Sequence, residues 1–230
     1  MKNLAIIPAR GGSKRIPKKN IRDFNGKPII GHVIEKAIES KIFSKVIVST
    51  DSIEVSDVSK IFGAEVPFVR PKEISDDVTS VIEVIRHGIK YSENVNETYE
   101  NICLLYPTAP LLDIKDLRKG LALLQTSDFA VSVSEFPFPI ERALVFNSDE
   151  QIIEMRIKKN FYSRSQDFPP AYHDAGQFIF GNKTAWMEKV PLINGKNSPV
   201  FIARERVQDI DNELDWDYAE KKGIILASES

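Results

Sequence analysis

Residues 6–20 read IIPARGGSKRIPKKN, and this stretch decides how the rest of the chain is interpreted. It begins as a continuous apolar run, which is typical of a strand covered on both faces of a sheet. The run opens into a loop that holds two adjacent glycines and five basic residues. Basic residues at the end of a first strand indicate an anion, and glycine lets the backbone approach it closely. We therefore expect an α/β fold with an anion-binding loop.

This loop matches neither of two common nucleotide-binding motifs. Its glycines are adjacent and no later glycine precedes the lysine, which excludes both GxxxxGK[ST] and GxGxxG. Backbone N–H groups of a glycine turn can still cradle phosphate, while arginine can hold two oxygens and lysine acts as a point charge. The alternative is a solvated basic loop, which would seldom combine this position with two glycines. The candidate anion ligands are Arg10, Gly11, Gly12, Ser13, Lys14 and Lys19.

Composition limits the class of protein. The chain has 230 residues and a formal net charge of −2, so the basic loop is a local feature, and a general nucleic-acid binder would be more basic. The one cysteine, Cys103, lies in an apolar run and indicates a core thiol in a reducing compartment. No apolar stretch approaches the roughly 20 residues that cross a bilayer, and the first strand is too short for a signal segment. We expect a soluble, cytoplasmic protein without nucleic-acid or membrane partners.

Strand and helix patterns alternate up to residue 136. Strands are expected to begin at residues 4, 45, 65, 101 and 129, with amphipathic helices between them. This alternation predicts a mostly parallel sheet with helices on both faces, in a single domain of residues 1–230. Loops that follow Pro8, Asp51, Arg70 and Tyr106 all leave the carboxyl ends of strands, where such sheets bind ligands. Asp51 itself is expected to cap the next helix.

The pattern is less regular after residue 136. A hairpin is expected near residues 147–150, strands at 177–181 and 199–203, and a final helix capped by Asn212. Residues 137–175 are rich in proline and aromatic residues and are our candidate for a protruding subdomain or dimer arm.

Asp209 and Asp211 lie one residue apart in the stretch VQDID. On an extended chain these side chains point the same way, and two carboxylates can bind Mg²⁺, which often bridges to substrate phosphates. The alternative is an acidic strand end that caps the following helix, and the spacing alone leaves both open. Zinc-type spacing of cysteine and histidine is absent. His173, in a polar loop, is the one histidine that is a candidate for proton transfer, because His32 and His87 lie in helical apolar stripes.

Together these stretches resemble a known family. IIPARGGSKRIPKKN, VIVSTDS, VPFVRPKEISDD, LLYPTAP and VQDID occur in the order seen in CMP-sialic acid synthetases, the cytidylyltransferases of acidic sugars. FPFPIERA and FYSRSQDFPPAYHDAGQFIFG are most similar to the bacterial pseudaminic acid cytidylyltransferases. The resemblance covers nearly the whole chain. It implies a Rossmann-like three-layer domain of the nucleotide-diphospho-sugar transferase type, a small dimerisation insertion, a homodimer, Mg²⁺, CTP as substrate and pyrophosphate as product.

The resemblance also implies roles for individual residues. It places the nucleotide on the basic loop and on a Pro-Thr loop, the metal on the acidic pair, and the sugar carboxylate near Arg164. The residues on the nucleotide side are Arg10, Ser13, Lys19, Asn20, Arg70, Thr79, Ser80, Pro107, Thr108 and Ala109, and the metal pair is Asp209 and Asp211.

Two departures from the sialic acid enzymes lie on the sugar side. Tyr106 replaces a glutamine before Pro-Thr, and the run from Asp174 to Phe178 replaces Asn-Gly-Ala with a later tyrosine. They point away from N-acetylneuraminic acid and leave the CTP chemistry intact. Pseudaminic acid is the expected acidic nonulosonic sugar, with legionaminic and N-acetylneuraminic acids as alternatives. The sugar-side candidates are Tyr106, Arg164, His173, Gln177 and Phe178.

The expected reaction is attack of the sugar's anomeric hydroxyl on the α-phosphorus of CTP. Arg10 and Lys19 would stabilise charge on the triphosphate and on the leaving group, and Asp209 and Asp211 would hold Mg²⁺. Two alternatives stay open. A metal-dependent glycosyltransferase also has Asp-x-Asp, but typically after a mid-domain strand rather than near the C-terminus. A non-catalytic CTP-binding regulator would tolerate loss of the acidic pair.

Overall fold

The computed structural model describes residues 2–188 and 190–229. Its centre is a six-stranded sheet in the order β10-β6-β9-β5-β1-β4. Neighbouring strands are parallel except at β9, which lies antiparallel between β5 and β6. The mostly parallel sheet expected from the sequence is confirmed. The strands are β1 Asn3–Pro8, β4 Lys45–Ser49, β5 Asn101–Leu105, β6 Phe129–Glu135, β9 Tyr172–Asn182 and β10 Asn197–Phe201.

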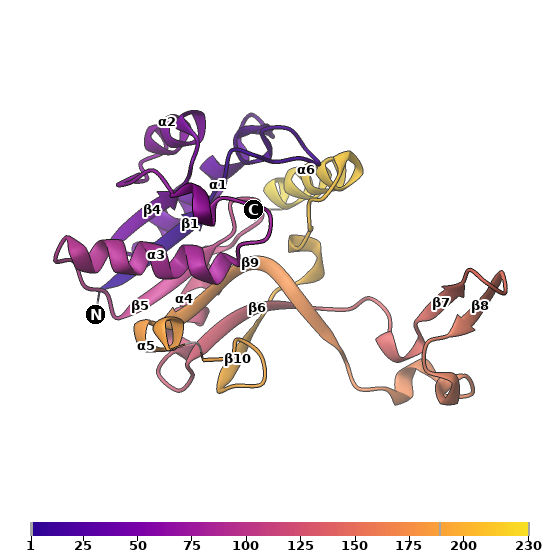
Figure 1. Ribbon diagram of the computed structural model, residues 1–230. Coiled ribbons are helices and arrows are strands. Elements are labelled where there is room, and N and C mark those ends of the chain that lie inside the picture. Colours follow the sequence, from indigo (N-terminus) through magenta and orange to yellow (C-terminus); the bar gives the residue numbers. More distant parts are fainter. Residues whose placement is uncertain (1, 189, 230) are drawn as a thin grey trace.

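Helices cover both faces of this sheet and make three layers (Figure 1). One face packs against α1 (Ile29–Glu39), α2 (Ile53–Ile61) and α4 (Ile114–Leu123). The other face packs against α3 (Val81–Asn94) and α5 (Lys183–Met187). In β1, Ala5 and Ile7 enter the first core, whereas Leu4 and Ile6 enter the second. Burial on both faces is the physical reason for the continuous apolar run.

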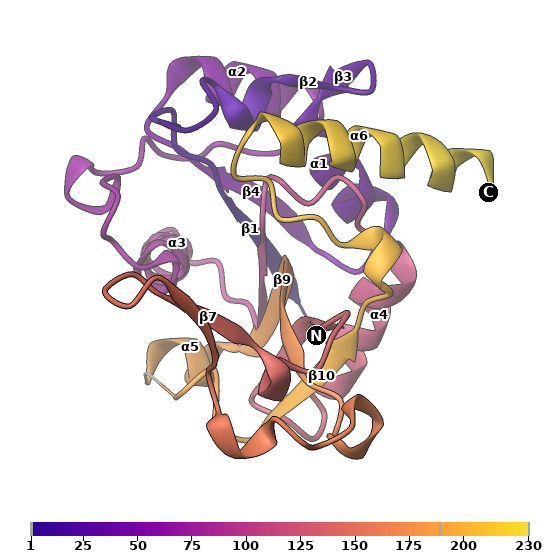
Figure 2. The same cartoon turned by 90° about the vertical axis from the view of Figure 1, so that its right-hand side faces the viewer.

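The last helix, α6 (Glu213–Ser228), packs against the basic loop and a short hairpin of β2 (Asp23–Phe24) and β3 (Lys27–Pro28). Its start is fixed by a capping box between Asn212 and Asp215, so the expected cap is confirmed. A small apolar cluster joins these distant segments at one end of the sheet, where α6 lies beside β2 and β3 (Figure 2). The cluster contains Ile16, Phe24, Ile29, Ile210, Trp216 and Ala219.

The strand expected from residue 65 is wrong. Residues 65–71 make only two isolated bridges to the sheet, Ile47–Glu65 and Thr50–Val69. Pro67 and Pro71 lack backbone N–H groups, so this segment cannot extend a regular ladder beside β4. The first part of the chain therefore supplies four strands to the sheet rather than five. The strand expected at 177–181 is part of a longer one, because β9 also pairs with β6 beyond a bulge between Val131 and Val133.

Residues 136–171 leave the sheet between β6 and β9 and lie apart from the main body (Figure 1). We call this segment the arm. It holds the expected hairpin, formed by β7 (Leu144–Asn147) and β8 (Ile152–Met155). Glu135 pairs with Tyr172, so the arm begins and ends at the carboxyl end of β6. Among the described residues, no helix is long and apolar enough to cross a membrane.

Candidate active site

A pocket of about 300 Å³ opens at the carboxyl ends of the parallel strands. It gathers the end of β1, the basic loop, the segment after β4 and the loop after β5, as the predicted topology requires. Residues 74–84, at and before the start of α3, close another side. The residues expected from the sequence that line this pocket are Arg10, Ser13, Lys14, Lys19, Asn20, Arg70, Thr79, Tyr106, Pro107 and Thr108.

The basic side chains of the loop have an acidic partner that the sequence analysis missed. Asp77 forms ion pairs with both Arg10 and Lys14. Hydrogen bonds from Lys14 and then Arg10 lower the pKa of Asp77. This carboxylate therefore occupies the two cations that were expected to hold an anion. Its position in ISDD suggested only a helix start, and no local signal pairs it with a loop more than 60 residues earlier.

Gly11 has a different role from the one expected. Its N–H donates to Asp51 Oδ1 at 2.9 Å, so this amide does not point freely at a ligand. Asp51 does not cap α2; Ser52 does, by accepting the N–H of Val55. A methyl group at Gly11 would lie 2.7 Å from Cβ of Ser52, whereas one at Gly12 would meet open space. Gly11 is therefore required because the loop passes directly over the start of α2.

We expect Gly11→Ala to lower kcat/KM for CTP, the substrate that the resemblance implies, about tenfold, since overpacking of this kind costs about 1–3 kcal/mol and must displace the loop. Gly12→Ala is the matched control and should stay within about twofold of wild type. Initial rates of pyrophosphate release at varied CTP measure both. Equal effects of the two substitutions would contradict this account of the loop.

Lys19 connects the basic loop to the acidic pair. Its Nζ donates to the carbonyl of Ile210 at 2.6 Å, between Asp209 and Asp211. Burial lowers the pKa of Lys19, and the two carboxylates oppose that shift. Ile210 is itself buried beside Trp216, so the flanking carboxylates face away from the core. The alternation expected of Asp-x-Asp on extended chain is present, although residues 207–211 belong to no strand.

The acidic pair offers two carboxylates to a metal ion. Among residues 2–188 and 190–229, no group of three or more histidine, cysteine or acidic side chains could hold a metal. Asp211 also pairs with Arg15 at 2.7 Å. A hard cation here would need further oxygens from phosphate and water, which is how Mg²⁺ usually binds beside nucleotides. The donor set therefore fits Mg²⁺ together with a polyphosphate.

Arg70 is held at the base of the pocket. Arg70 is 5% exposed. Its Nε donates to Ser49 Oγ at 3.1 Å, and its Nη2 donates to the backbone carbonyl of Ser49. Burial lowers the pKa of this guanidinium to about 10, with Asp51 opposing the shift. A cation fixed at the end of β4 in this way is preorganised for a polar ligand group.

Of the candidates for the sugar side, Tyr106 lines the pocket, whereas Gln177 and Phe178 do not. Tyr106 lines the pocket, and burial with the nearby charges of Asp174 and Asp209 raises its pKa to about 12. Gln177 is 3% exposed and turns away to the carbonyl of Arg206. Phe178 is fully buried in the core, so its side chain does not line the pocket. Apolar packing between β5 and β6 explains this placement, and it corrects the expectation for Phe178.

Several other expected residues do not line this pocket, Gly11 and Gly12 among them. His173 packs against Phe136 at the base of the arm, with ring centroids 4.9 Å apart. Arg164 lies on the arm and pairs with Asp167 at 2.9 Å. The Ser80 side chain caps α3, and Ala109 is buried in the core. Asp209 and Asp211 stand at the Lys19 end of the pocket rather than in its wall.

A family model described as cytidylyltransferase matches residues 4–215. A pseudaminic acid cytidylyltransferase of Campylobacter jejuni is 44% identical over 95% of both chains. A CMP-N,N'-diacetyllegionaminic acid synthase of Legionella pneumophila is 29% identical over 96% of both chains. An N-acylneuraminate cytidylyltransferase of Escherichia coli is 30% identical over 95% of this chain and 51% of its own length.

Solved structures support the fold. A CMP:2-keto-3-deoxy-manno-octonic acid synthetase complexed with CTP superposes with a TM-score of 0.70, at 18% identity over the whole of both chains. A 4-diphosphocytidyl-2C-methyl-D-erythritol synthase of Anaerococcus prevotii gives a TM-score of 0.64, at 12% identity over 96% of this chain and 97% of its own. At these identities the likeness shows the α/β fold alone.

Proposed function

We propose that this chain, which belongs to the cytidylyltransferase family, transfers CMP from CTP to the anomeric hydroxyl of pseudaminic acid. The hydroxyl oxygen bonds to the α-phosphorus, the bond from that phosphorus to the bridging oxygen breaks, and pyrophosphate leaves. The hydroxyl proton is lost to solvent. The observation that carries the proposal is the pocket, which Arg10, Lys14, Arg15 and Lys19 of one loop line, with the acidic pair beside Lys19. It lies in a chain that is 44% identical to a pseudaminic acid cytidylyltransferase.

The basic loop is proposed to bind the triphosphate. Arg10 and Lys14 exchange the Asp77 carboxylate for phosphate oxygens, which carry more negative charge. Lys19 faces the leaving group, where an ammonium stabilises the charge that develops. Arg70, which is buried, and Thr79, which is partly exposed, are proposed to contact the cytidine. The remaining proposed nucleotide contacts are Ser13, Asn20, Pro107 and Thr108, which line the same pocket.

Asp209 and Asp211 are proposed to hold Mg²⁺. When bound, the ion neutralises phosphate charge and polarises the α-phosphorus. The protein supplies the rest of the arrangement. Lys19 bonds the backbone between the two carboxylates, and Arg15 pairs with Asp211 and balances its charge.

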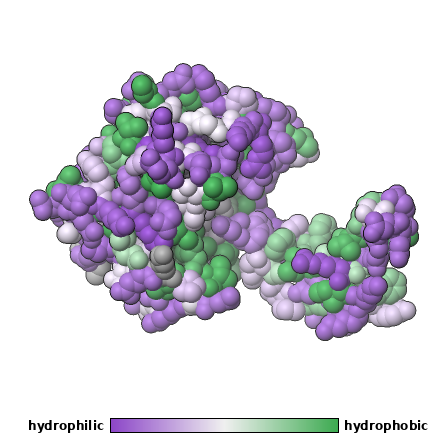
Figure 3. Space-filling view, in the orientation of Figure 1, coloured by the Kyte–Doolittle hydropathy of each residue, from purple (hydrophilic) through white to green (hydrophobic). Residues whose placement is uncertain are grey.

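The arm is proposed to form a homodimer. It carries a group of large apolar side chains that are more than half exposed, and apolar patches are visible over it in Figure 3. A second copy that covers them would bring its own arm near the carboxyl end of the first copy's β6, since the arm leaves from that end. Arg164 and His173 are proposed to act on the sugar in that assembly. The exposed apolar side chains are Phe138, Leu144, Phe146, Ile153, Phe161 and Tyr162.

A substrate panel tests the function. Purified protein with CTP and Mg²⁺ is offered pseudaminic, legionaminic, N-acetylneuraminic or ketodeoxyoctulosonic acid, and pyrophosphate and the CMP-sugar are measured. We expect turnover with pseudaminic acid. Turnover with another acid alone would keep the cytidylyltransferase and overturn the substrate. Measurable CTP binding without pyrophosphate release from any acid would favour the regulator.

Tyr106 is proposed to select the sugar. A tyrosine phenol is protonated at neutral pH and can donate a hydrogen bond, and burial, which raises the pKa of Tyr106 to about 12, does not change this. Tyr106→Phe should raise KM for pseudaminic acid about tenfold, the usual cost of one lost donor, and leave KM for CTP within about twofold. Steady-state kinetics with each substrate varied in turn measure both constants. A larger change in KM for CTP would place this side chain on the nucleotide side.

A further inference from the structure

The acidic pair stands on a segment without regular secondary structure, residues 207–211, between β10 and α6. We call this the acidic segment. Its carbonyls have no ladder partner, yet three carbonyls in or next to it accept bonds from long side chains. Lys19 donates to Ile210, Lys222 of α6 donates to Val207, and Gln177 of β9 donates to Arg206, each at 2.6 Å. Three separate elements therefore determine where the acidic segment lies.

The residue that precedes the segment is tied to α4 by a buried ion pair. Nη1 of Arg206 lies 2.6 Å from Oδ2 of Asp116, whose side chain is 2% exposed. The geometry is that of an ion pair, because neither atom has a hydrogen-bond partner within the described residues. Displacement of Arg206 would leave the buried Asp116 carboxylate with only the exposed Lys119, 3.3 Å away, so the pair resists displacement of Arg206.

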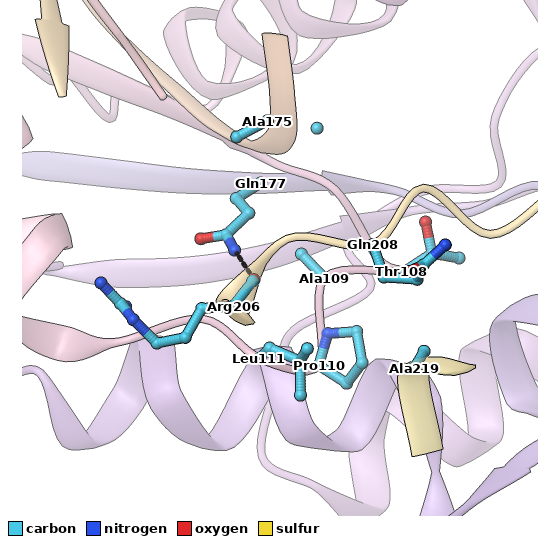
Figure 4. A pocket seen from close by; sticks show the side chains of 10 residues that line it. Thr108, Ala109, Pro110, Leu111, Ala175, Gln177, Arg206, Gln208 and Ala219 are labelled. Atoms are coloured by element: carbon cyan, nitrogen blue, oxygen red, sulfur yellow. Dashed lines mark hydrogen bonds between the residues drawn. The ribbon is translucent and has the colours of Figure 1, made fainter. Parts of the chain in front are cut away.

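Gln177 anchors the same residue from the sheet. Figure 4 shows its amide nitrogen directed at the backbone carbonyl of Arg206, beside a small pocket that Gln208 also lines. The pocket has a volume of about 10 Å³, enough for one water molecule. Oε1 of Gln177 is buried and has no protein partner in the part of the chain that the structure describes. The buried amide of Gln177 thus makes one hydrogen bond, to the residue just before the acidic segment. We therefore interpret Gln177 as a support for the segment rather than as a sugar ligand.

Lys222 supports the segment from the other side. Its Nζ donates to the carbonyl of Val207 and also lies 3.1 Å from Oε1 of Gln208. Burial lowers its pKa, with Glu205 opposing the shift. The neighbouring Lys221 is exposed and lies over the ring of Tyr218, 5.8 Å from its centroid. Of these two consecutive lysines of α6, Lys222 therefore contacts the acidic segment, whereas Lys221 contacts Tyr218.

We propose that Lys222 and Gln177 are positioning residues that hold Asp209 and Asp211 in register with the phosphate pocket. The inference rests on the proposed function, because it assigns the acidic pair to a metal–nucleotide complex. Loss of Lys222 leaves the carbonyl of Val207 in the acidic segment without this bond, and loss of Gln177 leaves the carbonyl of Arg206 just before the segment without its bond, so the segment relaxes toward solvent. Groups that orient metal ligands typically change metal affinity 10- to 100-fold when they are removed.

The test compares Lys222→Met with Lys221→Met. Each removes one ammonium and keeps a long side chain, but only the first removes a bond to the acidic segment. We measure binding of Mn²⁺ in the presence of CTP by electron paramagnetic resonance, then kcat, KM for CTP and Tm. The apparent Kd for Mn²⁺ should rise about tenfold in Lys222→Met, with KM for CTP within about twofold, and stay unchanged in Lys221→Met. Lys222→Arg should restore most of the affinity.

Each outcome decides the proposal. Equal Mn²⁺ affinity in the two variants overturns it, and so does a loss in Lys222→Met that Lys222→Arg does not recover. Should Lys222→Met fail to fold, Gln177→Met removes an independent bond to Arg206 and is judged by the same Mn²⁺ criterion. If wild type binds Mn²⁺ with CTP but activates no acidic sugar, the proposed function fails, while the Mn²⁺ comparison still judges the positioning.

Discussion

Replacing Asp211 with asparagine should lower kcat about a thousandfold. The substitution keeps the shape of the side chain and removes the charge that a hard cation requires, and metal stabilisation of the transition state amounts to several kcal/mol. The loss should appear in pyrophosphate release at saturating CTP and sugar. Excess Mg²⁺ should recover part of it, because the variant keeps Asp209 and an amide oxygen as weaker ligands.

Two controls separate metal binding from other effects of this change. Asp217→Asn removes one carboxylate from the exposed surface of α6 and should retain wild-type turnover. Arg15→Met removes the ion pair with Asp211 and leaves both carboxylates in place. If Arg15→Met lost as much activity as Asp211→Asn, the ion pair would be the cause. Wild-type turnover by Asp211→Asn would exclude a catalytic metal on the acidic pair.

Features that local pattern determines were predictable from the sequence. The buried strand at residues 4–7, the helix capped by Asn212 and the convergence of loops at one sheet edge depend on apolar period, capping chemistry and parallel topology. The prediction of a strand at residues 65–71 was wrong because it relied on the apolar residues of this segment and gave too little weight to its two prolines. Because prolines lack a backbone N–H group, this segment lies beside β4 but forms only two isolated bridges there.

The side-chain partners could not be predicted. Asp77 meets Arg10, and Arg206 meets Asp116, across 67 and 90 positions of the chain. Such pairs form only once the sheet has brought distant loops together, and no periodicity encodes them. Gln177 illustrates the same limit. Its place in the sequence suggested a sugar contact, but pairing within β9 turns its side chain inward, onto the acidic segment.

Lys19→Met should lower kcat/KM for CTP by about a hundredfold to a thousandfold. It removes the charge opposite the leaving group and also the bond to the carbonyl of Ile210. Lys19→Arg separates these effects, since it retains a cation. We expect kcat/KM of Lys19→Arg to reach at least a tenth of the wild-type value. The remaining loss of about tenfold is expected because the planar guanidinium of arginine does not place its charge where the lysine ammonium does.

The pH profile identifies this lysine. Burial lowers its pKa from the ordinary 10.5, so in the free enzyme the ammonium is present below the lowered pKa and is lost as the pH rises through it. Because kcat/KM reports the free enzyme, its alkaline limb should fall below pH 10.5 in wild type. In Lys19→Arg the limb should move to higher pH, since arginine stays charged. An unchanged limb in Lys19→Arg would assign the titration to another group and would contradict a charged role for Lys19 in binding the triphosphate.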